Sequence, residues 1–215
     1  MAISAGSEAI LHSLQGYVTE LHEEWKTLIA LFGSGDQTVQ LLNKTAGALF
    51  ETVYRTLMRD ILLGVARLTD PLQTAGQDNL VLERLTLLPE VCADPSIRAS
   101  VAAKLVDVKN KAKSFREYRH KYLAHLDLPT SLAPTGDVLP GIKREDVDGV
   151  LEEIATLFNM VDGPLRGRHV MFKDVAVHGG TPHLLRALED AQALKELPLA
   201  ERARLRKLAE VRYDA

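Results

Sequence analysis

The stretch that decides the fold covers residues 36–70 and reads DQTVQLLNKTAGALFETVYRTLMRDILLGVARLTD. Its apolar side chains recur at intervals of three and four residues, which is the period of an α-helix. Asp36 is a good N-cap, and Asp70 stands before a proline, a position that avoids the helical backbone conformation. The sequence therefore predicts one long helix over residues 37–69, with a weak point near Asn43 because a glycine follows shortly after it.

Two other stretches show the same period over a comparable length. One predicts a helix over residues 8–32, where it ends at a glycine. The other has Asp94 as N-cap and Pro95 at the first helical position, and it predicts a helix over residues 95–127. Shorter helices are expected at the remaining amphipathic stretches, which are residues 80–88, 145–161, 181–191 and 199–212.

The composition supports a helical core. The 215 residues are 46% hydrophobic but only 5% aromatic, so Leu, Val, Ile and Ala must build the interior. That balance favours helices over a β-sandwich or barrel. We therefore expect an all-α fold without a sheet. Residues 1–162 should form an antiparallel bundle of four to five main helices, and residues 163–215 a C-terminal helical extension.

Several functional classes are disfavoured by composition. The net charge of −3 argues against a protein that is basic overall and binds nucleic acid with its whole surface. The single cysteine excludes an internal disulfide framework and a cysteine-rich zinc site. No histidine or carboxylate cluster has ligand spacing, so neither a metal nor a cofactor is predicted. No stretch is apolar enough to cross a membrane and no signal peptide is visible, so a cytoplasmic location is expected.

Charge is concentrated in residues 104–121, which hold seven Lys or Arg against two acidic residues. The local charge of +5 leaves −8 for the rest of the chain, whose total is −3. This basic stretch could contact a phosphate backbone. From charge alone, a solvated face that pairs with acidic residues of the first helix is favoured over that interpretation. Those acidic residues are Glu8, Glu20, Glu23 and Glu24.

Arg119 stands on the apolar side of the helix predicted over residues 95–127. A guanidinium stays charged in a protein, so Arg119 needs a carboxylate, a phosphate or water as partner. Asp60, which flanks the apolar side of the central helix, is one candidate structural partner. His125 follows six residues after Arg119, about 9 Å further along an ideal helix and about 120° around it. The two side chains therefore diverge on a single helix.

Three sequence runs resemble one protein family. They are FREYRHKYLAHLD at residues 115–127, LLNKTAGALF at 41–50 and ARLTD at 66–70. Together they resemble the HEPN superfamily (higher eukaryotes and prokaryotes nucleotide-binding), in particular its abortive-infection U-type branch, over about residues 8–162. The resemblance implies an all-helical and usually dimeric protein. Many members are metal-independent ribonucleases in toxin–antitoxin, abortive-infection and other anti-phage systems.

The resemblance also implies roles for individual residues. Arg119 matches the motif arginine that binds the scissile phosphate, and His125 matches the motif histidine that acts as general acid or base. His120 occupies the position after the arginine, where the family most often has asparagine. No tyrosine follows His125, so the variant in which such a tyrosine is nucleotidylated by an antitoxin is not supported. Flanking phosphates are assigned to Lys113, Arg116 and Lys121.

The function expected from these roles is a metal-independent endoribonuclease, a toxin or phage-defence effector that cleaves RNA by 2′-hydroxyl attack. A symmetric homodimer is expected, because only a second copy brings diverging motifs into one cleft. An antitoxin protein is a further expected partner. One alternative is a catalytically silent HEPN-like module that binds a protein or a nucleic acid. Another is a structural bundle in which Asp60 neutralises Arg119.

Overall fold

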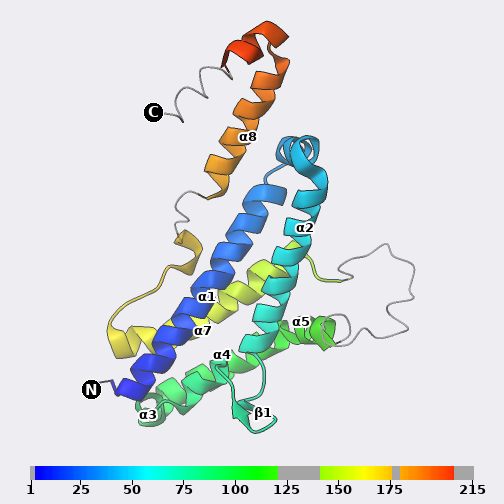
Figure 1. The fold of residues 1–215 in the computed structure, drawn as a ribbon. Coiled ribbons are helices and arrows are strands. Elements are labelled where there is room, and N and C mark those ends of the chain that lie inside the picture. Colours follow the sequence, from blue (N-terminus) through cyan, green and yellow to red (C-terminus); the bar gives the residue numbers. More distant parts are fainter. Residues whose placement is uncertain (1–2, 121–140, 176–179, 206–215) are drawn as a thin grey trace. The chain divides into compact units, whose positions relative to one another are not determined.

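The computed structural model describes residues 3–120, 141–175 and 180–205, and the statements below concern those residues. The fold is all-α, as predicted (Figure 1). The larger elements are α1 (Ala5–Phe32), α2 (Asp36–Leu68), α4 (Pro95–Lys111), α5 (Lys113–Tyr118), α7 (Arg144–Arg166) and α8 (Thr181–Glu196). The shorter helical elements are η1 (Leu82–Leu87), α3 (Pro89–Cys92) and η3 (Phe172–Asp174). Residues 199–205 are also helical.

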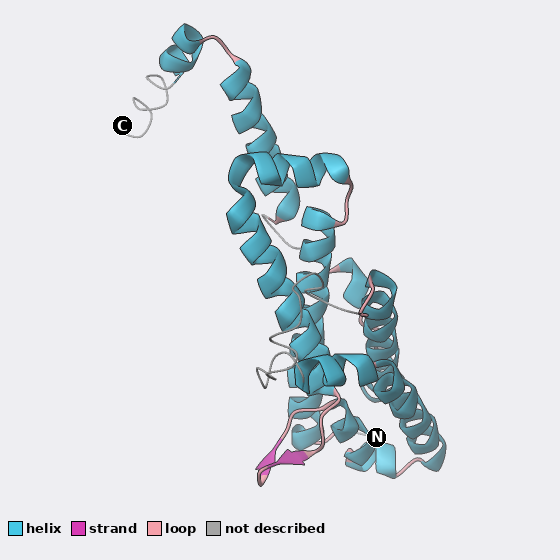
Figure 2. Cartoon of the chain, turned by 90° about the vertical axis from the view of Figure 1, so that its right-hand side faces the viewer, coloured by secondary structure: helices cyan, strands magenta, loops and turns pink. Residues whose placement is uncertain are grey.

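A two-stranded hairpin follows α2, and the prediction of a fold without a sheet missed it (Figure 2). Strands β1 (Gln73–Thr74) and β2 (Gln77–Asp78) pair antiparallel. The two residues between them, Ala75 and Gly76, have φ angles of 49° and 79°. Positive φ at both central positions is the requirement of a tight hairpin turn, and Asn-Gly or Asp-Gly usually signals it. Alanine at the first position hides that signal in the sequence.

The chain divides into two compact units. The first comprises residues 1–25 and 57–176, and the second comprises residues 26–56 and 177–215. Both α1 and α2 contribute one part to each unit. The boundary expected between residues 162 and 163 falls inside α7.

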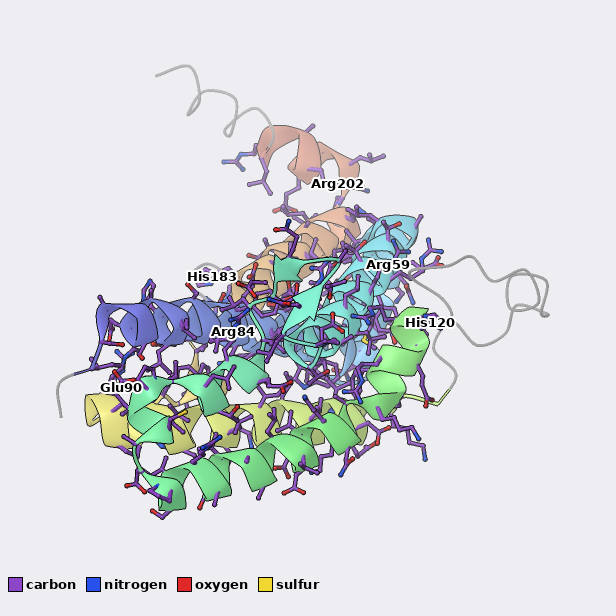
Figure 3. The ribbon with its side chains drawn as sticks, turned by 90° about the horizontal axis from the view of Figure 1, so that it is seen from below. Arg59, Arg84, Glu90, His120, His183 and Arg202 are labelled. Atoms are coloured by element: carbon purple, nitrogen blue, oxygen red, sulfur yellow. The ribbon has the colours of Figure 1, made fainter. Side chains whose placement is uncertain are left out.

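The core of the first unit lies between α1, α2, α4 and α7. Helices α4 and α7 lie side by side, and η1 packs against both (Figure 3). Gly64 of α2 explains how closely α1 and α2 approach each other, because a Cβ at that position would lie 2.3 Å from Leu21 Cδ2. Gly64 is thus a point of close contact between the two helices.

The second unit has a smaller core. Leu31, Leu42 and Phe50 are buried, and Leu185 and Leu188 of α8 pack against them. Within this unit α2 is interrupted at Ala46, whose φ and ψ are −158° and 63°. The weak point predicted near Asn43 therefore lies three residues from the observed kink.

The helix predicted over residues 95–127 is broken. Helix α4 ends at Lys111, Ala112 has a ψ of 0°, and α5 then begins at Lys113. The side chain of Arg116 stabilises the break, because its Nη2 donates a 3.0 Å hydrogen bond to the carbonyl of Lys109 in the last turn of α4. Residues 121–127 of the predicted helix lie outside the described residues. In the part of the chain that is described, no helix has the length and hydropathy of a membrane span.

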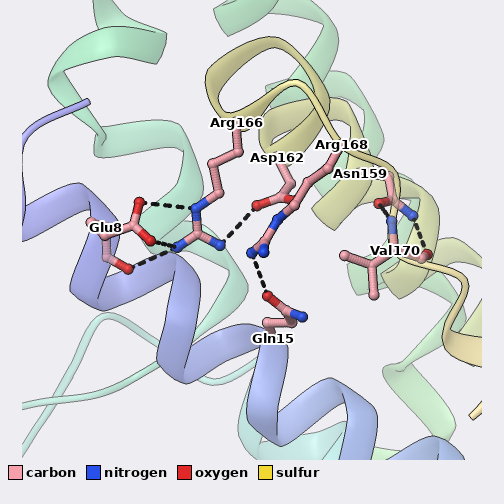
Figure 4. Close-up of polar contacts among 7 residues, drawn as sticks. All are labelled: Glu8, Gln15, Asn159, Asp162, Arg166, Arg168 and Val170. Atoms are coloured by element: carbon pink, nitrogen blue, oxygen red, sulfur yellow. Dashed lines mark hydrogen bonds and ion pairs between the residues drawn. The ribbon is translucent and has the colours of Figure 1, made fainter. Parts of the chain in front are cut away.

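A buried polar cluster joins the end of α7 to the start of α1 (Figure 4). The side chain of Asp162 is fully buried and accepts hydrogen bonds from Arg166 Nη1 at 3.0 Å and Arg168 Nε at 2.9 Å. Arg166 reaches on to the carboxylate and backbone carbonyl of Glu8, and Arg168 donates to Gln15. The loop after α7 is therefore fixed to α1 by charge-assisted hydrogen bonds.

Candidate functional site

Arg119 lies at the C-terminal end of α5, where its backbone is still helical with φ −54° and ψ −47°. Phe115, one turn earlier, is fully buried and holds α5 against the core. From this position the Arg119 side chain reaches Asp70 at the end of α2. Arg119 Nη1 lies 2.6 Å from Asp70 Oδ1 and 2.5 Å from Oδ2. The side chains of Arg119 and Asp70 remain 28% and 19% exposed, so solvent reaches both members of the pair.

The end of α2 places Asp70. The amides of Thr69 and Asp70 both donate 3.2 Å bonds into the last turn of the helix, to Ala66 and Arg67. The hydroxyl of Thr69 is buried and donates to the carbonyls of Val65 and Ala66, both at 3.1 Å. Pro71 then ends the helix, because the residue before a proline disfavours the helical conformation. The carboxylate of Asp70 is therefore attached to a well-defined helix end.

The hairpin that follows Asp70 is fixed at its base. Asn79 donates through its side chain to the carbonyl of Pro71 at 2.8 Å and through its amide to the carbonyl of Leu72 at 2.8 Å. Arg84 donates through Nε to the carbonyl of Asn79 at 2.9 Å and through Nη2 to that of Leu72 at 3.2 Å. The backbone on both sides of Asp70 is thus held by hydrogen bonds.

Asp70, and not Asp60, is the carboxylate that Arg119 contacts. Ten residues separate the two aspartates, which corresponds to about 15 Å along a helix. Asp60 instead lines a cavity of about 230 Å³ with Tyr17, Glu20, Leu21, Glu24 and Arg67. Burial there raises the pKa of Glu24 to about 7, and the charges of Asp60 and Glu20 add to the effect.

The other predicted site residues are placed differently. His120 follows Arg119 and is exposed at the end of the α5 segment (Figure 3). Lys113 is exposed, with its Nζ 3.9 Å from Glu117. Arg116 is half-buried, and its contact to Lys109 uses the side chain for helix capping. His125 and Lys121 lie outside the described residues.

Most of the basic stretch is paired within the fold. Lys104 and Lys111 form ion pairs with Glu153 of α7, and Lys109 lies 2.6 Å from Glu83 of η1. Hydrogen bonds from Lys104 and then Lys111 lower the pKa of Glu153. The expectation that these cations pair with acidic residues of the first helix was wrong, because α4 packs against α7 and η1. Among the basic residues before Arg119, Lys113 is left with the weakest of these contacts.

Sequence reasoning missed Asp70 as a member of the site. It stands in the quoted run at residues 66–70, directly before a proline, so a carboxylate at a helix end was visible. What the sequence lacked was the register between α2 and α5, which decides which aspartate Arg119 meets. In the described part of the chain, no group of three or more His, Cys, Asp or Glu side chains could hold a metal ion.

A comparison with protein families identifies the chain. The HEPN_AbiU2 family model, described as AbiU2, matches residues 8–178. No curated protein and no solved structure gives a match. The matched region contains all three sequence runs that resemble the abortive-infection U-type branch, together with Arg119 and Asp70. The chain therefore belongs to the HEPN AbiU2 family of abortive-infection proteins.

Proposed function

We propose that this protein is a metal-independent endoribonuclease that acts as a toxin or phage-defence effector. The observation that carries the proposal is the position of Arg119. This arginine lies at a helix end, is 28% exposed, and uses one nitrogen, Nη1, for its contact with Asp70. A permanently charged, solvent-accessible guanidinium on a fixed support is suited to bind a phosphate.

The reaction needs no metal because RNA carries its own nucleophile, the 2′-hydroxyl. That oxygen attacks the adjacent phosphorus while a base removes its proton, and the bond to the 5′-oxygen breaks as an acid protonates it. The products are a 2′,3′-cyclic phosphate and a 5′-hydroxyl. We assign the proton transfers to His125 and the stabilisation of the negative phosphorane to Arg119. We assign to His120 a further hydrogen bond to a phosphate oxygen.

The proposed enzyme is a homodimer. On an ideal helix Arg119 and His125 would diverge, so we infer that two copies face each other to line one cleft. Lys113 and Lys121 would bind flanking phosphates, whereas the half-buried Arg116 would support the site through Lys109. Sedimentation at micromolar concentration should show a dimer of the 23.7 kDa chain, and a purely monomeric species would contradict this arrangement. Co-expression would reveal whether an antitoxin protein neutralises the activity.

The test is cleavage of single-stranded RNA by purified protein in excess EDTA. We expect products with 2′,3′-cyclic phosphate or 3′-phosphate ends, and no cleavage of DNA, which lacks the 2′-hydroxyl. His125→Ala should reduce the rate by about a hundredfold to ten-thousandfold, the range for loss of a general acid or base. Arg119→Ala should also abolish cleavage, and Arg119→Lys should restore little because a point charge cannot replace a planar fork.

Two results would contradict the ribonuclease proposal. Unchanged cleavage by His125→Ala would assign the activity to another site or to a contaminant. Absence of cleavage by folded wild-type protein in every RNA tested would favour the second candidate, a silent module that binds RNA or a protein. The pairing of Lys104, Lys109 and Lys111 with Glu153 and Glu83 speaks for that candidate, because it leaves little unpaired positive charge around α4.

A further inference from the structure

We propose that Asp70 is a positioning residue that orients the guanidinium of Arg119 toward the scissile phosphate. The inference rests on the proposed ribonuclease function. It adds to the proposed site a residue at the end of α2, whereas Arg119 lies at the end of α5. Its basis is the contact of both Asp70 oxygens with a single nitrogen, at 2.5 Å and 2.6 Å. Asp70 thereby holds one end of the guanidinium.

The geometry of this contact indicates that Asp70 orients the guanidinium of Arg119 and does not merely neutralise its charge. A guanidinium has five N–H donors in a planar fork, and a phosphate is bound best by two parallel N–H groups. The contact with Asp70 uses only Nη1, so the Nε and Nη2 edge lies outside it. A carboxylate that covered that edge would compete directly with a phosphate for the same donors.

Asp70 is well suited to position another side chain because its own backbone is fixed. Helix α2 ends in the hydrogen bonds of Thr69, and Asn79 and Arg84 hold the carbonyls of Pro71 and Leu72. The carboxylate is also short, with two side-chain torsions. Catalytic groups need this kind of support, since a displacement of about 1 Å can cost about a hundredfold in rate.

The charge of Asp70 also affects the expected affinity for RNA. The negative charge of Asp70 lowers the positive potential beside Arg119 and therefore weakens the attraction of RNA. Removing Asp70 should leave the affinity for RNA unchanged or increase it, while the loosened guanidinium stabilises the transition state less. A fall in kcat without a rise in KM distinguishes positioning from a role in binding RNA.

The experiment compares Asp70→Ala and Asp70→Asn with wild type in the RNA cleavage assay. We expect Asp70→Ala to lower kcat by about tenfold to a hundredfold, the range for misplacement of a catalytic group, with KM equal or lower. Asp70→Asn should recover part of kcat, because its amide oxygen still accepts a hydrogen bond from Nη1. Glu83→Gln is the matched control, since it removes the charge of another half-exposed pair, Glu83–Lys109, and should leave kcat unchanged.

A second measurement detects the orientation of the Arg119 guanidinium and does not depend on RNA cleavage. In ¹⁵N spectra, the side-chain Nη signals of Arg119 should be resolved in wild type and averaged by rotation in Asp70→Ala. Resolved signals in both proteins, or wild-type kcat in Asp70→Ala, would overturn the positioning role. A higher kcat/KM in Asp70→Ala would overturn it as well and would identify Asp70 as an inhibitory clamp. If wild type cuts no RNA but the signals average as expected, the ribonuclease proposal fails while the orientation by Asp70 stands.

Discussion

Two aspartate–arginine contacts of the first unit, Asp162–Arg166 and Asp70–Arg119, differ in burial and in the number of guanidinium nitrogens that the protein engages. Asp162 is fully buried, and Arg166, its main partner, is 7% exposed. Asp70 and Arg119 are 19% and 28% exposed. All three guanidinium nitrogens of Arg166 are engaged, by Asp162 and by the carboxylate and carbonyl of Glu8. The contact between Arg119 and Asp70 involves one nitrogen.

This difference in burial indicates which arginine stabilises the fold and which could bind a ligand. A buried ion pair must have its hydrogen bonds satisfied by the protein, because no water replaces them. Every guanidinium nitrogen of Arg166 is therefore already used within the protein, and its cluster joins α7 to α1 (Figure 4). A half-exposed pair exchanges with solvent and contributes little to stability. Arg119 is consequently the arginine of the two that suits a ligand.

The largest expected effect is on the buried cluster. Asp162→Asn leaves the charges of Arg166 and Arg168 without their buried carboxylate, so we expect the free energy of unfolding to fall by about 3–5 kcal/mol. Chemical denaturation measures this change, with Asp107→Asn, at an exposed position of α4, as control. The protein that remains folded should keep its RNA cleavage rate. A stable Asp162→Asn protein that lost cleavage would reverse the roles assigned to the two contacts.

A pH-dependent effect on stability is expected at the cavity that Glu24 lines together with Glu20 and Asp60. The pKa of Glu24 is raised from 4.5 to about 7, first by burial and then by Asp60 and Glu20. The protonated form is thus favoured in the folded state, and the stability linked to it is present below pH 4.5 and is lost as the pH rises through about 7. Glu24→Gln should therefore raise Tm at pH 8 and change it little at pH 4.

Glu90 is the control for this titration, because hydrogen bonds from Ser7 and Ser4 lower its pKa from 4.5 to about 2. Its stabilising contribution is present above pH 4.5 and is lost as the pH falls toward 2. Glu90→Gln should accordingly lower Tm near neutral pH and have less effect in acid. A Tm difference of Glu24→Gln that did not grow between pH 5 and pH 8 would contradict the assignment of the raised pKa.

The smallest expected effect is the contribution of the exposed pair to stability. A double-mutant cycle of Arg119→Ala and Asp70→Ala should give a coupling free energy of unfolding of no more than about 1 kcal/mol, since solvent screens both charges. The corresponding cycle of Arg166→Ala and Asp162→Ala should give a larger value. A coupling of about 3 kcal/mol between Arg119 and Asp70 would show that this pair stabilises the fold, and it would contradict the proposed difference between this pair and Arg166–Asp162.

Helical periodicity predicted the fold class and the ends of α1 and α2 closely, because amphipathic patterns over about thirty residues reflect the core directly. Periodicity did not predict two local features of the backbone, the hairpin after α2 and the break between α4 and α5. The hairpin turn has alanine at its first positive-φ position, and the break at Ala112 depends on Arg116 capping α4. The first feature is the backbone conformation of one residue and the second is one side-chain hydrogen bond, and periodicity registers neither.

The sequence by itself determined that the chain is all-α, that Arg119 needs a partner and that its neighbourhood resembles the HEPN motif. Only the tertiary structure decided that the partner is Asp70, and that Glu83 and Glu153 pair with Lys104, Lys109 and Lys111. The reason is physical. Spacing along one helix fixes which side chains share a face, whereas the contact between two helices depends on their register, and a shift of ten residues moves it by about 15 Å.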